Sequence, residues 1–157
     1  PANGHSWEEI QAFIRQLNDA HGGGFRLPTE AEWERACRAG TATAYCFGDD
    51  GSKASEYAWM ASGNQGPVGT KKANAWGLYD MHANVWEFCE DYYAPGYFSS
   101  SELIDPKGPA TGDRRVIRGD CSVGHTPRSA VRSGLDPAEK NGAVGFRLCW
   151  TPLEKPT

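Results

Sequence analysis

The sequence predicts an α+β fold of two helices and short antiparallel strands joined by many loops. Two segments near the N-terminus combine helical spacing of apolar residues with a capping box, whereas later segments show only short β-branched or aromatic runs. The 19 glycines and 10 prolines indicate frequent turns. We expect one domain over residues 1–150 and a frayed tail over residues 151–157.

The first helix is predicted from Ser6 to Asn18. Ser6 and Glu9 form a capping box at its start, and glycines 22–24 end it. Its apolar residues recur on one face, at Trp7, Ile10, Phe13, Ile14 and Leu17.

The second helix follows a short extended link, Phe25–Leu27. Pro28 cannot lie inside a helix, and Thr29 with Glu32 forms a second capping box directly after it. The spacing predicts that Trp33, Ala36 and Cys37 face inward and that Gly40 terminates the helix.

The segment Asn74–Tyr93 carries two tryptophans, three tyrosines and a phenylalanine, with Asp, Asn and Glu among them. Buried polar groups must be hydrogen-bonded or ligate something. The pattern is typical of neither a plain helix nor a plain strand, so we predict a compact, loop-rich core element around a hard cation. Short strands are predicted at Val116–Arg118 and Gly145–Trp150.

The charge balance of 16 Lys and Arg against 20 Asp and Glu gives a net charge of −4, which argues against nonspecific nucleic-acid binding and against membrane insertion. We find no apolar run of the ~18 residues that a spanning helix needs, and no signal peptide. Surface display and a cytoplasmic location both stay open.

The five cysteines are odd in number and show no CxxC spacing, which argues against a zinc site or a redox motif. Cys37 and Cys89 are expected to be small buried residues. A disulfide would require export, and its connectivity stays open.

Five ordered blocks carry a family resemblance. They read RLPTEAEWERACRAG (Arg26–Gly40), NAWGLYDMHANVWEF (Asn74–Phe88), RVIRG (Arg115–Gly119), RSAVR (Arg128–Arg132) and GFRL (Gly145–Leu148). Together they resemble the formylglycine-generating-enzyme (sulfatase-modifying factor) family, which implies a C-type-lectin-like fold from about Ser6 to Leu148. That fold hosts both enzymes and binding proteins.

The resemblance implies a calcium ion held by the side chains of Asp80 and Glu87 and the backbone carbonyls of Ala83 and Val85. Calcium prefers about six to eight hard oxygen ligands, which suits this set. Ala83 stands where the family commonly has glycine, so a left-handed backbone would be strained there. The alternative is that Glu87 pairs with an arginine, such as Arg118 or Arg147, and no metal binds. Asn84 is expected to hold the loop through side-chain to backbone hydrogen bonds.

Catalysis in the family enzymes uses two closely spaced cysteines that bind Cu(I). Soft thiolates select Cu(I), and a single thiolate is insufficient. Here residues 118–125 read RGDCSVGH, with Gly124 where the enzymes have the first cysteine and no second cysteine before Arg128. We therefore assign no catalytic residue. The alternative is a copper-dependent formylglycine-generating oxidase, in which Cys121 and His125 would be the copper ligands, or a degenerate descendant of such an enzyme. The four histidines are scattered, unlike those of an iron oxygenase site.

The blocks also resemble the variable proteins of diversity-generating retroelements, which diversify surface residues by adenine-directed mutagenesis. This mutagenesis cannot create Lys, Glu, Gln, Trp or Met, and residues 120–136 contain none of these. Turn chemistry or drift could produce the same composition. The resemblance implies a noncatalytic display protein that is diversified between Asp120 and Val144 and binds a protein or another surface ligand.

The predicted ligand-binding residues are loop residues on a rigid scaffold. They are Asp120, Cys121, Ser122, Val123, His125, Thr126, Val131, Ser133, Leu135, Asp136, Ala138 and Asn141. Tyr92, Tyr93 and Tyr97 either flank the pocket or pack in the core. A buried hydrogen-bond network beneath the site is expected from Arg118, Arg128, Arg132 and Arg147.

Overall fold

The computed structural model describes residues 1–60, 65–99, 101–102, 104–120 and 127–152. Its centre is a four-stranded sheet in the order β4-β3-β2-β5. These strands are β2 (Trp86–Tyr92), β3 (Arg115–Arg118), β4 (Arg132–Leu135) and β5 (Val144–Phe146). The pairs β2–β3 and β3–β4 are antiparallel, whereas β5 lies parallel to β2.

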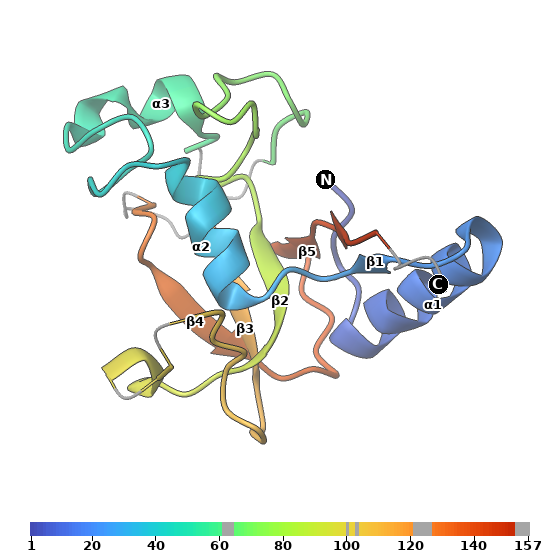
Figure 1. The fold of residues 1–157 in the computed structure, drawn as a ribbon. Coiled ribbons are helices and arrows are strands. Elements are labelled where there is room, and N and C mark those ends of the chain that lie inside the picture. Colours follow the sequence, from blue (N-terminus) through green and yellow to red (C-terminus); the bar gives the residue numbers. More distant parts are fainter. Residues whose placement is uncertain (61–64, 100, 103, 121–126, 153–157) are drawn as a thin grey trace.

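Two longer helices pack on opposite faces of this sheet (Figure 1). Helix α1 (Trp7–His21) buries Ile10 and Ile14 against Phe88, Ile117 and Val144. Helix α2 (Glu30–Arg38) buries Trp33 and Cys37 against Met81, Cys89 and Val116. Successive residues of β2 and of β3 therefore enter different cores, as expected because side chains alternate across a strand.

Both helices begin at the predicted capping boxes. The Ser6 hydroxyl accepts from the Glu9 amide, and the Thr29 hydroxyl accepts from the Glu32 amide. Gly22 ends α1 in the left-handed conformation, with φ 80°, so the helix continues to His21, beyond the predicted Asn18. Helix α2 ends at Ala39 (φ 47°), one residue earlier than predicted. The inward positions of Trp33 and Cys37 are confirmed, whereas Phe13 is 45% exposed and packs edge-on against Phe146.

Smaller elements complete the fold. Strand β1 (Phe25–Arg26) pairs antiparallel with β6 (Cys149–Trp150) in a two-stranded sheet. A third helix, α3 (Ala54–Tyr57), follows the 3-10 turn η1 (Gly51–Lys53), and a second such turn is η2 (Tyr97–Ser99). No helix in the described part of the chain has both the length and the apolar character needed to cross a membrane.

The α+β class is confirmed, with four differences from the predicted elements. The structure has a third helix, and one strand pair is parallel. The predicted strand Gly145–Trp150 is divided between β5 and β6, which lie in different sheets. The second half of Asn74–Tyr93 is the central strand β2. Because both faces of β2 are covered, its sequence lacks the apolar–polar alternation that predicts a half-exposed strand. The expected fraying after residue 152 concerns residues outside those described.

The start of α2 is attached to the end of β2. The Glu30 amide donates to Oδ2 of Asp91 over 2.7 Å, and the Glu90 amide donates to the Pro28 carbonyl over 2.9 Å. Asp91 is only 3% exposed. Burial raises the pKa of Asp91 from 3.8 to about 6, and the nearby Glu30 carboxylate adds to this, although the Glu30 amide opposes it. The helix is therefore fixed by a carboxylate that is costly to ionise.

This carboxylate predicts a pH dependence of stability. Since its folded-state pKa lies above the ordinary 3.8, the folded protein binds more protons than the unfolded chain between roughly pH 4 and 6. The contribution of Asp91 to stability therefore falls as pH rises through about 6. Asp91→Asn keeps an oxygen for the Glu30 amide, so its stability relative to the wild type should be higher at pH 7 than at pH 4, by urea unfolding. The exposed control Asp113→Asn should show no such difference, and equal behaviour of the two variants would contradict the assignment.

Candidate functional site

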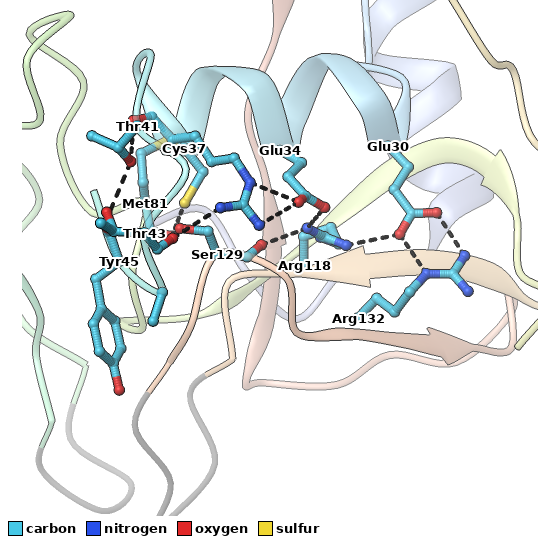
Figure 2. Close-up of polar contacts among 12 residues, drawn as sticks. Glu30, Glu34, Cys37, Thr41, Thr43, Tyr45, Met81, Arg118, Ser129 and Arg132 are labelled. Carbon is cyan, nitrogen blue, oxygen red and sulfur yellow. Dashed lines mark hydrogen bonds and ion pairs between the residues drawn. The ribbon is translucent and has the colours of Figure 1, made fainter. Parts of the chain in front are cut away.

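Two arginines on neighbouring strands meet two glutamates beneath α2. Arg118 ends β3 and Arg132 begins β4, and the two residues are paired directly across the strands. Like charges in such positions repel. Glu30 and Glu34 lie one turn apart on α2, so both carboxylates reach the same face of the sheet (Figure 2).

Glu30 lies between the two guanidinium groups. Arg132 donates from Nε to Oε1 over 2.6 Å and from Nη2 to Oε2 over 2.7 Å, which is a bidentate pair. Arg118 donates from Nη1 to Oε1 of the same carboxylate over 2.9 Å. The side chains of Arg118 and Glu30 are 0% and 1% exposed. Burial lowers the pKa of Arg132, but the hydrogen bonds to Glu30 outweigh it, so this pKa is raised.

The network continues toward the end of α2. Nη2 of Arg118 donates to Oε2 of Glu34 and to the Ser129 carbonyl, each over 2.6 Å (Figure 2). Arg38 donates to Oε1 of Glu34 over 2.8 Å and to the Thr43 carbonyl over 2.9 Å. Five side chains of alternating charge thus run from Arg132 to Arg38. They tie α2 to β3, to β4 and to the segment that leads into β4.

A second buried ion pair meets this network at Trp33. The guanidinium carbon of Arg118 lies 5.2 Å from the Trp33 ring centroid, and the Trp33 indole donates to Oε2 of Glu87 over 2.7 Å. Arg147 donates to both oxygens of Glu87, over 2.5 and 2.7 Å. Burial lowers the pKa of Arg147, but the Glu87 charge outweighs it and the pKa is raised. Arg118, Arg132 and Arg147 are thus anchored as expected, whereas Arg128 is exposed.

The predicted ligand-binding residues are distributed over several environments. Cys121, Ser122, Val123, His125 and Thr126 lie outside the described residues. Asp120 follows β3 and is 3% exposed. Val131 and Ser133 are half-buried, and Leu135 packs on the core beneath α1. Asp136, Ala138 and Asn141 lie in the turns between β4 and β5, at the far end of β4 from Val131. The structure therefore places Val131 and Ser133 near the ionic network and the last three residues away from it.

Each of the three tyrosines contacts an arginine or another aromatic ring. The Arg115 guanidinium lies 3.6 Å from the Tyr92 ring centroid and 3.9 Å from that of Trp7. Arg132 lies 4.8 Å from the centroid of Tyr93, and Tyr97 packs edge-on against Phe98.

A groove of about 770 Å³ borders the ionic network on its solvent side. Three charged residues of the network line it, namely Glu34, Arg38 and Arg132. The exposed rings of Trp76 and Phe98 line it as well. Ala130 also lines it, directly before Val131.

The loop expected to hold calcium has one feature that suits a cation and one that does not. Oδ1 of Asp80 is buried and has no hydrogen-bond partner among the described residues, while Oδ2 accepts from the Gly69 amide. Both oxygens of Glu87 already accept from Arg147, which was the alternative interpretation of this residue. Ala83 adopts the left-handed conformation, with φ 60°. Asn84 holds the loop as predicted, through both backbone groups of Gly66.

The calcium assignment therefore stays a prediction, because only one of its two carboxylates has a free oxygen. Within the described ranges, no three His, Cys, Asp or Glu side chains converge in a way that could hold a metal ion.

The four described thiols have raised pKa values, although only Cys37 and Cys89 are fully buried and Cys46 and Cys149 are half-buried. Burial raises the pKa of Cys37 to about 12 and that of Cys46 to about 11, and it also raises the pKa values of Cys89 and Cys149. None of these four is in a disulfide, and the predicted burial of Cys37 and Cys89 is confirmed. A neutral thiol is a poor nucleophile and a poor metal ligand.

His82 is a structural residue rather than a ligand. One ring nitrogen, Nδ1, lies 2.7 Å from the Pro127 carbonyl, and Nε2 accepts from the Cys46 amide over 3.2 Å. These partners fit the neutral ring with its proton on Nδ1. Burial lowers the pKa of His82, which keeps the ring neutral.

Glu30 and Glu34 were missed as site residues, although the sequence carries a signal for Glu30. It precedes Trp33 by three residues and Cys37 by seven, so it lies on the inward apolar stripe of α2. An acidic residue on such a stripe needs a buried cation.

Removal of the Glu30 carboxylate should lower the free energy of unfolding of the domain. Glu30→Gln leaves Arg118 without a full counter-charge, so we expect a loss of about 3–5 kcal/mol in the free energy of unfolding, measured with urea. Glu56→Gln is the matched control, because the Glu56–Lys72 pair is solvent-exposed, and it should cost less than about 1 kcal/mol. Similar losses in both variants would show that the buried network does not stabilise the fold.

Comparison with known proteins gives matches across nearly the whole chain. The family profile described as the sulfatase-modifying factor enzyme 1-like domain matches residues 1–152. The formylglycine-generating enzyme of Streptomyces coelicolor is 35% identical over 164 residues, covering 90% of this chain and 50% of that protein. The serine/threonine-protein kinase pkn1 of Chlamydia caviae is 43% identical over 129 residues, covering 79% of this chain and 21% of the kinase.

A solved structure agrees with these sequence matches. Treponema denticola variable protein 1 superposes with a TM-score of 0.75 at 37% identity, covering 82% of this chain and 48% of that one. The chain spans half the length or less of these relatives. It shares the C-type-lectin-like fold with the solved structure. The chain therefore belongs to the sulfatase-modifying factor enzyme 1-like domain family, which includes the formylglycine-generating enzymes.

Proposed function

We propose that this domain is a noncatalytic ligand-binding display protein, the variable protein of a diversity-generating retroelement, diversified between Asp120 and Val144. The observation that carries the proposal is the buried network of Arg118, Glu30 and Arg132. It holds the ends of the two strands that flank residues 119–131. A loop whose ends are fixed by residues outside it can change its own side chains at little cost to the fold.

Three further observations support this function. The chain is similar to a variable protein in both sequence and structure. Residues 120–136 contain none of the five residue types that adenine-directed mutagenesis cannot create. In addition, the residues that support the loop come from the framework blocks RLPTEAEWERACRAG, RVIRG and RSAVR, so the buried contacts are made by residues other than the predicted variable positions.

A copper-dependent formylglycine-generating oxidase is the second candidate. The 35% identity to the Streptomyces enzyme over 90% of the chain favours it. Against it, the sequence does not match the cysteine pair of the family enzymes, and the four described cysteines, two of them buried and two half-buried, have raised pKa values. A Cu(I) site needs accessible thiolates, because copper binding replaces the thiol proton.

An oxidase assay separates the two candidates. The protein is incubated with Cu(I) and a synthetic sulfatase-type Cys-x-Pro-x-Arg peptide, while oxygen consumption and peptide mass are followed. We expect no conversion of the peptide cysteine to an aldehyde, because the sequence does not match the cysteine pair of the family enzymes. The Streptomyces coelicolor enzyme is the positive control. Aldehyde formation would overturn the proposal and make Cys121 and His125 the first residues to replace.

The surrounding DNA tests the proposed function independently of catalysis. A reverse-transcriptase gene should lie nearby, with a near-copy of the segment that encodes residues 120–144. The copies should differ only where the template has adenine. A sulfatase gene in their place, without a repeat, would count against a diversified protein.

We also propose that calcium stabilises the Asp80–Glu87 loop. The unpartnered oxygen of Asp80 supports this, with the carbonyls of Ala83 and Val85 as the further ligands that the family resemblance implies. Glu87 could contribute only the remaining lone pair of Oε1, since Oε2 accepts from both Arg147 and Trp33 while Oε1 accepts from Arg147. The ion would neutralise the charge of Asp80 and so lower the free-energy cost of burying this carboxylate.

Calcium should raise the melting temperature of the chelator-treated protein, because a ligand that binds only the folded state stabilises it. Asp80→Ala should abolish this rise, whereas Asp19→Ala, an exposed control on α1, should retain it. A wild-type protein whose melting temperature does not respond to calcium would contradict a calcium site in this loop.

A further inference from the structure

The groove beside the ionic network has the composition of a peptide-binding site. It runs along the outer side of α2 and has Trp76 and Phe98 among its lining residues. These two rings are 51% and 44% exposed. Large aromatic side chains are costly to leave in water, and exposed clusters of them mark interaction sites. Tryptophan in particular is enriched among residues that dominate binding energy.

The charged lining of the groove is mainly positive. Arg35, Arg38 and Arg132 line it, against the single carboxylate of Glu34. This excess is notable because the chain as a whole has a net charge of −4. A negatively charged ligand would therefore be attracted to this face in preference to the rest of the surface.

One of these arginines is available to a ligand. Arg38 and Arg132 already bind Glu34 and Glu30. The Arg35 guanidinium instead lies 5.9 Å from the Trp76 ring centroid, and no carboxylate within the described ranges pairs with it. A guanidinium held over an aromatic ring keeps its donor edge free for a carboxylate. Arg35 and Trp76 thus offer an anion contact and an apolar contact side by side.

We propose that this groove binds an acidic, extended peptide segment of a partner protein, with an apolar side chain between Trp76 and Phe98 and a carboxylate on Arg35. The inference rests on the proposed binding function and names the chemistry of its partner. Ala130 and Arg132 line the groove and belong to the framework of the predicted variable segment. The groove therefore supplies a constant contact, while the neighbouring loop supplies the varied ones.

The test uses two synthetic peptides that differ only at their charged positions, which are acidic in one and basic in the other. Acetyl-Glu-Asp-Leu-Glu-Asp-amide and its counterpart with lysine at each acidic position are titrated into isotope-labelled protein, and amide chemical shifts are recorded. The acidic peptide should bind and shift the amides of Arg35, Trp76 and Phe98, and its affinity should fall as salt is added. The lysine peptide should not bind.

Variants identify the contacts. Arg35→Gln removes the charge alone and should weaken binding of the acidic peptide about tenfold, the effect of losing one charge-assisted contact. Trp76→Ala should weaken it by a similar factor. Arg15→Gln is the matched control, because Arg15 is an exposed arginine on α1, remote from the groove lining, and its removal should leave the affinity unchanged. Circular dichroism and thermal melting check that each variant is folded.

Four results would overturn the inference. The acidic peptide could fail to saturate the protein, Arg35→Gln could bind as tightly as the wild type, or a single-stranded oligonucleotide could bind the groove as well as the peptide. A concentration-dependent dimer that Trp76→Ala abolishes would also reject it, because the groove would then be an interface between copies. None of these outcomes involves copper or peptide oxidation, so failure here is distinct from failure of the proposed function.

Discussion

The complete burial of the Arg118 side chain is the constraint on which the rest of this domain depends. An ammonium- or guanidinium-sized charge costs several kcal/mol to remove from water, so it persists only with good partners. Glu30, Glu34 and the Ser129 carbonyl provide them, and the Trp33 ring lies against the guanidinium. Each partner comes from α2 or from the segment before β4. The position of Arg118 therefore dictates where the helix lies on the sheet.

The two faces of the sheet are consequently stabilised in different ways. Beneath α1 the contacts are apolar and tolerate changes of shape that conserve volume. Beneath α2 the apolar cluster is bordered by ion pairs, which specify one geometry. The ion pairs beneath α2 are directional, and they fix the ends of β3 and β4 beside the groove that Trp76 and Phe98 line. Asp91 adds to them by accepting from the first amide of the helix, at the cost of a buried carboxylate.

The elements that were predicted correctly depend on local contacts. The capping boxes of α1 and α2 join residues three apart, so the sequence contains both halves of each. The strand β2 was missed because it is covered on both faces, and the parallel pairing of β5 joins residues far apart in the chain. The roles of Asn84 and of the buried cysteines were predicted because amide and thiol chemistry leave few alternatives in an apolar segment.

The sequence by itself determined the α+β class, the family, the starts of both long helices and the lack of a matching cysteine pair. Each of these depends only on residue types and on their spacing over short distances in the chain. Only the tertiary structure decided which arginine meets which carboxylate. Glu87 could pair with Arg118 or Arg147 on sequence grounds, and the fold places Arg147 there while Glu30 receives Arg118 and Arg132. Likewise, the exposure of Trp76 and Phe98 in one groove follows from how distant segments pack. Side-chain chemistry sets what a residue can bind, but long-range packing selects among chemically equivalent partners.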